Sequence, residues 1–271
     1  MEKVSVFLAD WQVLFREGIH FILSGEEDFE VIGEATSNEE ALNFIEKNPP
    51  RVAIFNADRG KPSGIEITRR IKQNLPSVAI ILVMDSENNE QLLSGMKGGA
   101  SAYLTKDANP DELIDTIRKV AQGDRPISQA LLIPEIASRV VDEFEAFSSL
   151  SEEVGNLLAR LLPVEVEILR HIAGGSLIEE ITRALGISEE TISHHLDLIL
   201  DKLVANERSR QVIEAAQSNL TSIISKISKA KQAAMPSADY ITKEEFAAFK
   251  ESLNERFKSL AEKEAKSGGA R

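Results

Sequence analysis

The chain has 271 residues, of which 42% are apolar and 28% charged, and its formal net charge is −13. This composition is that of an ordinary globular protein long enough for two domains, each with its own core. No apolar run approaches the roughly 18 residues that span a bilayer, so we expect no membrane segment and a cytoplasmic location. Zero cysteines exclude disulfides, thiolate metal sites and cysteine nucleophiles. The acidity disfavours nucleic-acid binding unless a segment is locally basic.

Residues 1–122 alternate short β-branched runs with amphipathic segments, which predicts a doubly wound parallel sheet with helices on both faces. Five strands are expected, at residues 4–10, 29–35, 51–57, 78–84 and 101–106. The helices expected between or after them include residues 15–24, 38–47 and 109–122. The first domain is therefore predicted to be an α/β domain of about five strands.

Residues 123–149 are predicted to form a helical linker, in which Pro134 opens a helix with one apolar stripe. The stripe consists of Ile136, Val140, Val141, Phe144 and Phe147. It needs another apolar surface to pack against. Residues 150–212 are helical in pattern and are predicted to form an all-α domain. Residues 213–271 are predicted to be a C-terminal helical extension.

In the extension, apolar residues recur at alternating steps of three and four, which predicts a coiled-coil seam and a homo-oligomer. The seam consists of Ile213, Ala216, Leu220, Ile223, Ile227 and Ala230. The alternative is an intramolecular helix that packs back on the linker stripe. After Pro236, a capping box of Thr242 and Glu245 predicts a final helix.

Three stretches of the first domain, "VFLADWQVLFREG", "FNADRGKPSGIEITRRI" and "GGASAYLTKDANPDELIDTIRKV", resemble the receiver domain of NarL/FixJ-type response regulators. The resemblance implies phosphoryl transfer to an Asp that ends the third strand, assisted by an acidic pair holding Mg²⁺, a Thr or Ser, and a Lys. Gly64 stands where the family's loop glycine is expected, and it places the phosphoacceptor position on Asn56. The remaining positions fall on Asp10 and Trp11 (acidic pair), Met84 (Thr or Ser), Lys106 (Lys) and Tyr103 (an aromatic residue that matches the family).

These departures predict a degenerate receiver that does not accept phosphate. An amide is a poor nucleophile, so Asn56 is not expected to form an acyl phosphate. Only one carboxylate, Asp10, remains for Mg²⁺, and Asp10 and Lys106 can pair without a metal, so we expect no cofactor. The alternatives are that Asn56 is only a turn residue, or that Asp58 in the following loop replaces it. Trp11 is expected to be either a lid or interface aromatic or a buried packing residue.

The second domain, "LPVEVEILRHIAGGSLIEEITRALGISEETISHHLDLILDKLVANERSR", resembles the LuxR-type helix-turn-helix, with residues 189–203 as recognition helix. The resemblance implies DNA binding, which normally depends on basic residues. Here residues 188–203 carry a charge of −3, and residues 150–212 hold six basic and eleven acidic residues. The residues that could still contact DNA are Thr191, Ser193, His194, His195, Lys202, Arg208 and Arg210. For the two histidines a structural role, with one ring packed and one exposed, is favoured over metal ligation.

Two functions fit these patterns. The first is an atypical, phosphorylation-independent response regulator that acts on transcription through its helix-turn-helix. The second is an adaptor derived from a response regulator, in which the receiver face, the acidic helix-turn-helix and the C-terminal helices bind proteins. No nucleophile with a base, phosphate loop or metal cluster is visible, so an enzyme is not expected. The intact helix-turn-helix pattern favours the first.

Overall fold

The computed structural model describes residues 3–57, 60, 62–148 and 158–233, together with 247, 250 and 251. For residues 147–148 and 217–233 only the backbone is described. Two compact units are present, Met1–Ile213 and Glu214–Arg271. The predictions for Asp58, for the side chains of the seam beyond residue 216 and for the final helix with its capping box lie outside the residues described in this way.

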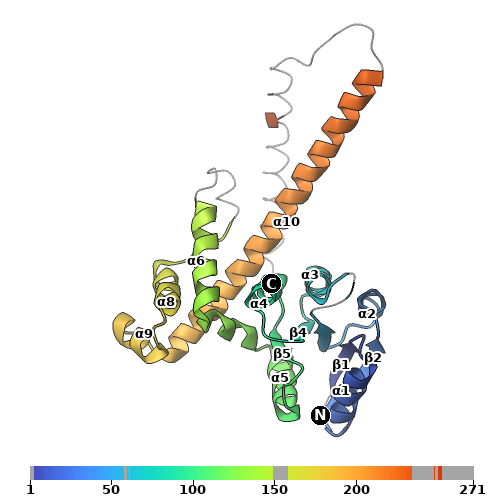
Figure 1. The fold of residues 1–271 in the computed structure, drawn as a ribbon, viewed down its shortest axis with the longest axis vertical. Helices are drawn as coiled ribbons and strands as arrows, with labels where there is room; N and C mark the ends of the chain where they lie inside the picture. The colour runs from blue at the N-terminus through green and yellow to red at the C-terminus, as the bar shows by residue number, and fades with distance from the viewer. Residues whose placement is uncertain are drawn as a thin grey trace, which may run out of the picture. The chain divides into compact units, whose positions relative to one another are not determined.

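Five parallel strands form one sheet in the order β2-β1-β3-β4-β5 (Figure 1). The strands are β1 (Val4–Ala9), β2 (Phe29–Ala35), β3 (Val52–Asn56), β4 (Ala79–Met84) and β5 (Ala102–Thr105). Every residue of β3 and β4 is buried, because the central strands of a doubly wound sheet are covered on both faces. The predicted α/β architecture is confirmed.

The helices of this domain are divided between the two faces of the sheet. The helix α1 (Val13–Ser24) and the helix α5 (Pro110–Gln122) pack on one face. The opposite face is covered by α2 (Asn38–Ile45), α3 (Gly64–Asn74) and α4 (Asn89–Gly98). Four of the five begin at a polar residue whose side chain accepts a first-turn N–H, which fixes where each helix starts. These caps are Ser37, Ser63, Asn88 and Asn109.

The linker consists of a 3₁₀ helix, η1 (Pro126–Leu132), and the helix α6 (Pro134–Ser148). Its predicted stripe is buried at Ile136, Val140 and Phe144, and α6 packs chiefly against the first helix of the second domain (Figure 1). The alternative in which the C-terminal segment packs on this stripe stays a prediction, because the side chains beyond residue 216 lie outside those described.

The second domain contains α8 (Pro163–Ala173), α9 (Ile178–Leu185) and α10 (Glu189–Ala233). Gly186, with φ of +66°, forms the left-handed turn between α9 and α10. A recognition helix ending at Leu203 and a separate helix from Ile213 were expected, but α10 runs through both as one helix of 45 residues. The reason is visible in the sequence, which has neither Gly nor Pro between residues 189 and 233 to end the helix.

The apolar cores of the two domains are continuous on one face of the sheet. The apolar cluster on the α2, α3 and α4 face of the sheet continues through η1 and α6 into the core of the helix-turn-helix. Both domains accordingly fall within the single unit Met1–Ile213.

Candidate functional site

The carboxyl ends of three parallel strands bring the main pocket residues to one edge of the sheet. Asp10 follows β1, Asn56 ends β3 and Lys106 follows β5. The start of α3 lies directly against Asn56, because a Cβ on Gly64 would lie 2.1 Å from the Asn56 carbonyl oxygen. Only glycine fits there, and this places Asn56 beside the turn that follows the strand.

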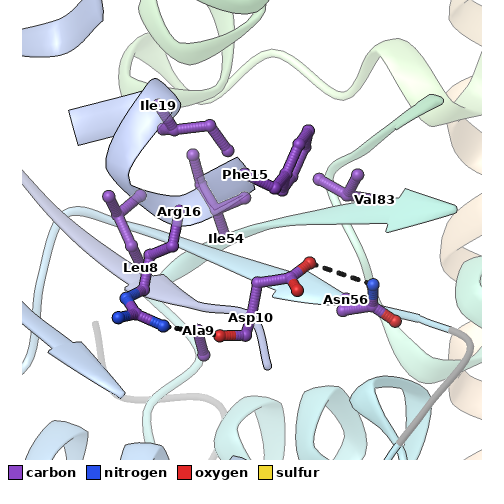
Figure 2. Close-up of a pocket in the computed structure, with 9 residues that line it drawn as sticks. All are labelled: Leu8, Ala9, Asp10, Phe15, Arg16, Ile19, Ile54, Asn56 and Val83. Atoms are coloured by element: carbon purple, nitrogen blue, oxygen red, sulfur yellow. Dashed lines mark hydrogen bonds between the residues drawn. The ribbon is translucent and has the colours of Figure 1, made fainter. Parts of the chain in front are cut away.

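Asp10 is buried, and hydrogen bonds from this chain reach both of its carboxylate oxygens. The Asn56 amide donates from Nδ2 to Oδ2 at 2.9 Å, as Figure 2 shows. The backbone N–H of Gln12 donates to Oδ1 at 2.7 Å. Asn56 therefore serves Asp10 as a hydrogen-bond donor, which is the opposite of a nucleophilic role.

Lys106 is held by groups from two loops. Its Nζ lies 2.6 Å from Asp85 Oδ1 and 3.8 Å from Asp10 Oδ2, and it donates to Gln12 Oε1 at 2.7 Å. The prediction that one carboxylate faces one lysine was therefore wrong. Asp85 directly follows β4 at the same sheet edge, and that position was the signal that could have found it.

Two aromatic rings also face the ammonium group of Lys106. Its Nζ lies 5.3 Å from the ring centroid of Phe15 and 5.9 Å from that of Trp11, within the range of cation–π attraction. Trp11 is 46% exposed, which excludes the buried packing role considered for it. A contact with a partner at this rim stays a prediction.

Two of the predicted pocket residues lie on the other face of the sheet. Met84 is fully buried in the cluster beneath α3 and α4, while its neighbour Val83 lines the pocket on the α1 side. Tyr103 also packs on the α4 side, and burial together with Glu87 and Glu112 raises the pKa of its phenol. The structure thus brings together Asp10, Asn56 and Lys106, but not Met84.

A buried arginine that the sequence did not single out completes the pocket lining. Arg16 donates from Nη1 to the backbone oxygen of Asp10 at 2.9 Å and from Nε to Glu34 at 2.7 Å. His20 contacts the same carboxylate. Partial burial, which would raise the pKa of Glu34, is outweighed by hydrogen bonds from His20 and Arg16, so this pKa lies below its usual value. Arg16 lies three residues before the buried Ile19 on α1, and this helical spacing was the signal that could have placed Arg16 on the buried face.

The helix-turn-helix has a buried polar cluster of its own. Glu165, at the start of α8, is completely buried and accepts from Lys202 Nζ at 2.5 and 2.7 Å. It also accepts the backbone N–H of Leu162 at 2.7 Å, which caps α8. His195 Nδ1 lies 4.0 Å from the same carboxylate. In this conformation Lys202 and His195 are engaged inside the domain.

The other candidate DNA-contacting residues lie on the outer part of α10. His194 is exposed, whereas Thr191 and Ser193 are half-buried. Thr191 is not among the buried residues of the core. Arg208 donates to the backbone oxygen of Lys72 at 3.1 Å, and Arg210 lies 2.8 Å from Glu207. The arginines at the end of the motif are thus held by intramolecular contacts.

Three of the acidic residues that lower the charge of α10 lie close to arginines of this chain. Arg125, just before η1, contacts Asp201 and lies 3.9 Å from the carboxylate of Asp197. Glu207 is buried and lies 3.4 Å from Arg69 of α3. The acidic side of the recognition segment therefore faces arginines of this chain.

Among the residues that the structure describes, no group of three or more His, Cys, Asp or Glu side chains could hold a metal ion. None of the helices in the described ranges is long and apolar enough to cross a membrane.

A five-stranded receiver-like domain with an acidic residue and a lysine at its rim, joined to a helix-turn-helix, defines a class of two-domain signalling regulator. The model of the response regulator receiver domain matches residues 6–118, and the model of the luxR family of bacterial regulatory proteins matches residues 160–215. Among solved structures, the signal receiver domain of the putative response regulator NarL from Mycobacterium tuberculosis is 26% identical with a TM-score of 0.44. The similarity covers 45% of this chain and 99% of that one.

Two curated proteins are similar over most of their length. The uncharacterized transcriptional regulatory protein YxjL of Bacillus subtilis (strain 168) is 31% identical over 220 residues, which cover 81% of this chain and 98% of that protein. The transcriptional regulatory protein DegU of Brevibacillus brevis is 30% identical over 224 residues, covering 79% and 93%. This chain therefore belongs to the response regulators that join a receiver domain to a LuxR-type DNA-binding domain. About a fifth of it lies outside each match.

Proposed function

We propose that this response regulator acts on transcription without phosphorylation of its receiver. The observation that carries the proposal is the 2.9 Å hydrogen bond from the Asn56 amide to Asp10. A carboxylate at position 56 would repel Asp10 and favour a bound cation, whereas the Asn56 amide N–H donates a hydrogen bond to Asp10 and adds no negative charge. Asn56 offers no carboxylate oxygen to attack phosphorus.

The packing of the pocket supports the same proposal. Arg16, Phe15 and Val83 line the space beside Asp10, and this partly open pocket measures about 10 Å³. That volume is about the room that one water molecule requires. Lys106, the cation that would contact a phosphoryl oxygen, is already paired with Asp85. A phosphoryl group would have to displace several of these contacts.

The test is intact-mass analysis after incubation with a small phosphodonor and Mg²⁺. We expect no added phosphoryl group on the native chain. An Asn56→Asp variant is the matched control, because it restores a carboxylate nucleophile at the same position. A phosphoryl adduct on the native chain that disappears when Asp10 or Asp85 is substituted would contradict the proposal.

For transcription, we propose that α10 contacts DNA through one exposed and two half-buried polar side chains. His194, Thr191 and Ser193 lie on the outer part of the helix. Lys202 and His195 are assigned instead to the buried cluster around Glu165, because they contact its carboxylate. The proposed interface is therefore poor in positive charge, and its affinity would depend on few phosphate contacts or on a second subunit.

A second candidate function is an adaptor that binds proteins rather than DNA. The pairing of Asp197 and Asp201 with Arg125 favours it, because this part of α10 serves as an intramolecular docking surface. Arg208, a candidate phosphate contact, is likewise directed to a backbone oxygen of α3. The acidic helix-turn-helix would then keep its fold while presenting a protein-binding surface.

Gel retardation with genomic fragments at about 50 and 200 mM salt separates the two functions, since phosphate contacts weaken steeply with salt. For the regulator we expect a shift at the lower salt that weakens at the higher. Asp201→Asn should strengthen that shift because it removes a charge that repels phosphate, whereas Glu26→Gln, on the first domain, should leave it unchanged. No shift at either salt with either protein would favour the adaptor.

We further propose that the extension forms a homo-oligomer through the seam that begins at Ile213 and Ala216. The support is the three-and-four spacing in the sequence and the continuous helix to Ala233. Sedimentation of a chain that ends at Ile213, where the first compact unit ends, tests it. We expect a monomer, and an unchanged oligomeric state would contradict the seam.

A further inference from the structure

The receiver domain and the helix-turn-helix are joined by an unbroken apolar core. From the sheet, the cluster of buried side chains includes Phe55 and Leu82. It continues into η1 with Ile127 and Leu131, which are both completely buried. In the linker helix it takes in Ile136, Val140 and Phe144, and in the second domain Ile168, Ile172 and Leu203. Each of these neighbouring elements thus contributes buried apolar side chains to the same cluster.

The 3₁₀ helix η1 is fixed to the sheet as well as to α8. The backbone N–H of Ile127 donates to the oxygen of Ser101 at the start of β5, at 3.1 Å. The helix η1 contacts β5, α4 and α5 of the first domain and also contacts α6 and α8. It therefore packs as a shared element of both domains rather than as a free connection.

A second connection runs between α10 and the first domain. Arg125 contacts Asp201, and Arg69 of α3 lies 3.4 Å from Glu207. Arg208 donates to the backbone oxygen of Lys72, three residues after Arg69 on α3. Separating the domains would expose the apolar side chains of the shared cluster to water. It would also remove Arg69 from the buried carboxylate of Glu207.

We propose that the receiver and the helix-turn-helix of this chain form one cooperative body, which unfolds and moves as a unit. The position of the first half of α10 is then set by the receiver fold itself. A signal would have to change the whole body or its partners, since a swing of one domain on the linker would break the shared core. This inference does not depend on whether the receiver is phosphorylated.

The single tryptophan of the chain, Trp11, provides the test, because its fluorescence reports unfolding of the first domain. In thermal unfolding of the full chain, Ile168→Ala removes a buried side chain from α8, in the other domain. If the body is cooperative, the Trp11 transition of Ile168→Ala falls by roughly 5–10 °C. If the domains are independent, the Trp11 transition is unchanged, and the proposal is overturned.

Three further variants make the result interpretable. Ile54→Val, in the sheet core, sets the scale of a shift that originates in the first domain. Leu177→Ala, at an exposed side chain of the second domain, should leave the Trp11 transition in place. Should Ile168→Ala fail to fold, Ile172→Val is a milder change at the same core and should lower the Trp11 transition by about 2–4 °C. A shift in this variant supports cooperativity, and its absence contradicts it.

Discussion

Each half of the molecule has a buried carboxylate with a nearby lysine, Asp10 in the receiver and Glu165 in the helix-turn-helix, and the two sites differ in what surrounds that carboxylate. In the receiver, Asp10 lies at the sheet rim and is satisfied by an amide, a backbone N–H and a more distant lysine. In the helix-turn-helix, Glu165 lies in the core and is satisfied by a direct contact with Lys202. The first site has the position of a reaction centre without its reactive groups, and the second is a structural support.

In both sites the role of the lysine depends on the carboxylate nearest to it. That carboxylate can be far from the lysine in the sequence. Lys106 pairs with Asp85, and Lys202 pairs with Glu165 across 37 residues. In the family pattern Lys106 assists phosphoryl transfer, although in this chain it was expected to pair with Asp10, and Lys202 was a candidate contact for DNA phosphate. In each case the lysine instead contacts a carboxylate of the chain itself.

The largest effect is expected from Glu165→Ala, which leaves the ammonium of Lys202 without its partner and the first turn of α8 without its cap. Removal of one member of a buried ion pair costs about 3 kcal/mol in unfolding free energy. Urea unfolding followed by circular dichroism measures it. Glu167→Ala, on the exposed side of the same helix, is the control and should cost less than about 0.5 kcal/mol. Equal losses for the two variants would show that Glu165 is not a structural support.

A smaller effect is expected from Asp10→Ala. This change leaves the Asn56 amide and the Gln12 N–H without an acceptor, which costs about 2 kcal/mol. Urea unfolding followed by Trp11 fluorescence measures it. Asp85→Ala removes the other carboxylate that contacts Lys106, but its side chain is 41% exposed, so its loss should cost less than about 1 kcal/mol. A gain in stability for Asp10→Ala would mean that Asp10 is kept for a ligand that this pocket binds.

Much of the fold could be predicted from local pattern. The five strands follow from β-branched runs, and the three predicted helices begin within two residues of their observed starts, because periodicity and caps are local properties. The continuity of α10 was missed because the prediction placed a boundary where the family resemblance ended. No helix-breaking residue supported that boundary.

The candidate site was predictable where a strand end determines the position, as for Asp10, Asn56 and Lys106. Met84 was misplaced because the side chains of a strand alternate between faces, and a position at a strand end does not show which face it takes. Arg16 and Asp85 were missed although a local signal existed for each, the helical spacing of Arg16 and the strand-end position of Asp85. Their partners, Glu34 for Arg16 and Lys106 for Asp85, come from other segments of the chain, and such contacts are set by tertiary packing, which local pattern does not encode.

The last prediction concerns a third lysine, which donates to backbone carbonyls instead of a carboxylate. Lys72 Nζ contacts the oxygens of Pro76 and Val78 at 2.7 and 2.9 Å. Burial, with added repulsion from Arg208 and Arg125, lowers the pKa of Lys72 to about 8. In the unfolded chain its pKa is about 10.4. Between these values the unfolded state binds more protons, so stability should rise with pH above 8.

Urea midpoints at pH 7.5, 8.5 and 9.5 test this dependence. We expect the midpoint to rise across the series in the native chain and to rise less in Lys72→Met, which keeps the apolar stem but cannot titrate. The range stops below pH 10 because the raised pKa of Tyr103 makes stability fall once tyrosines in the unfolded chain begin to ionise. An identical slope in both proteins would mean that the burial of Lys72 does not disfavour its charge. The contrast with the carboxylate-paired lysines would then lose its physical basis.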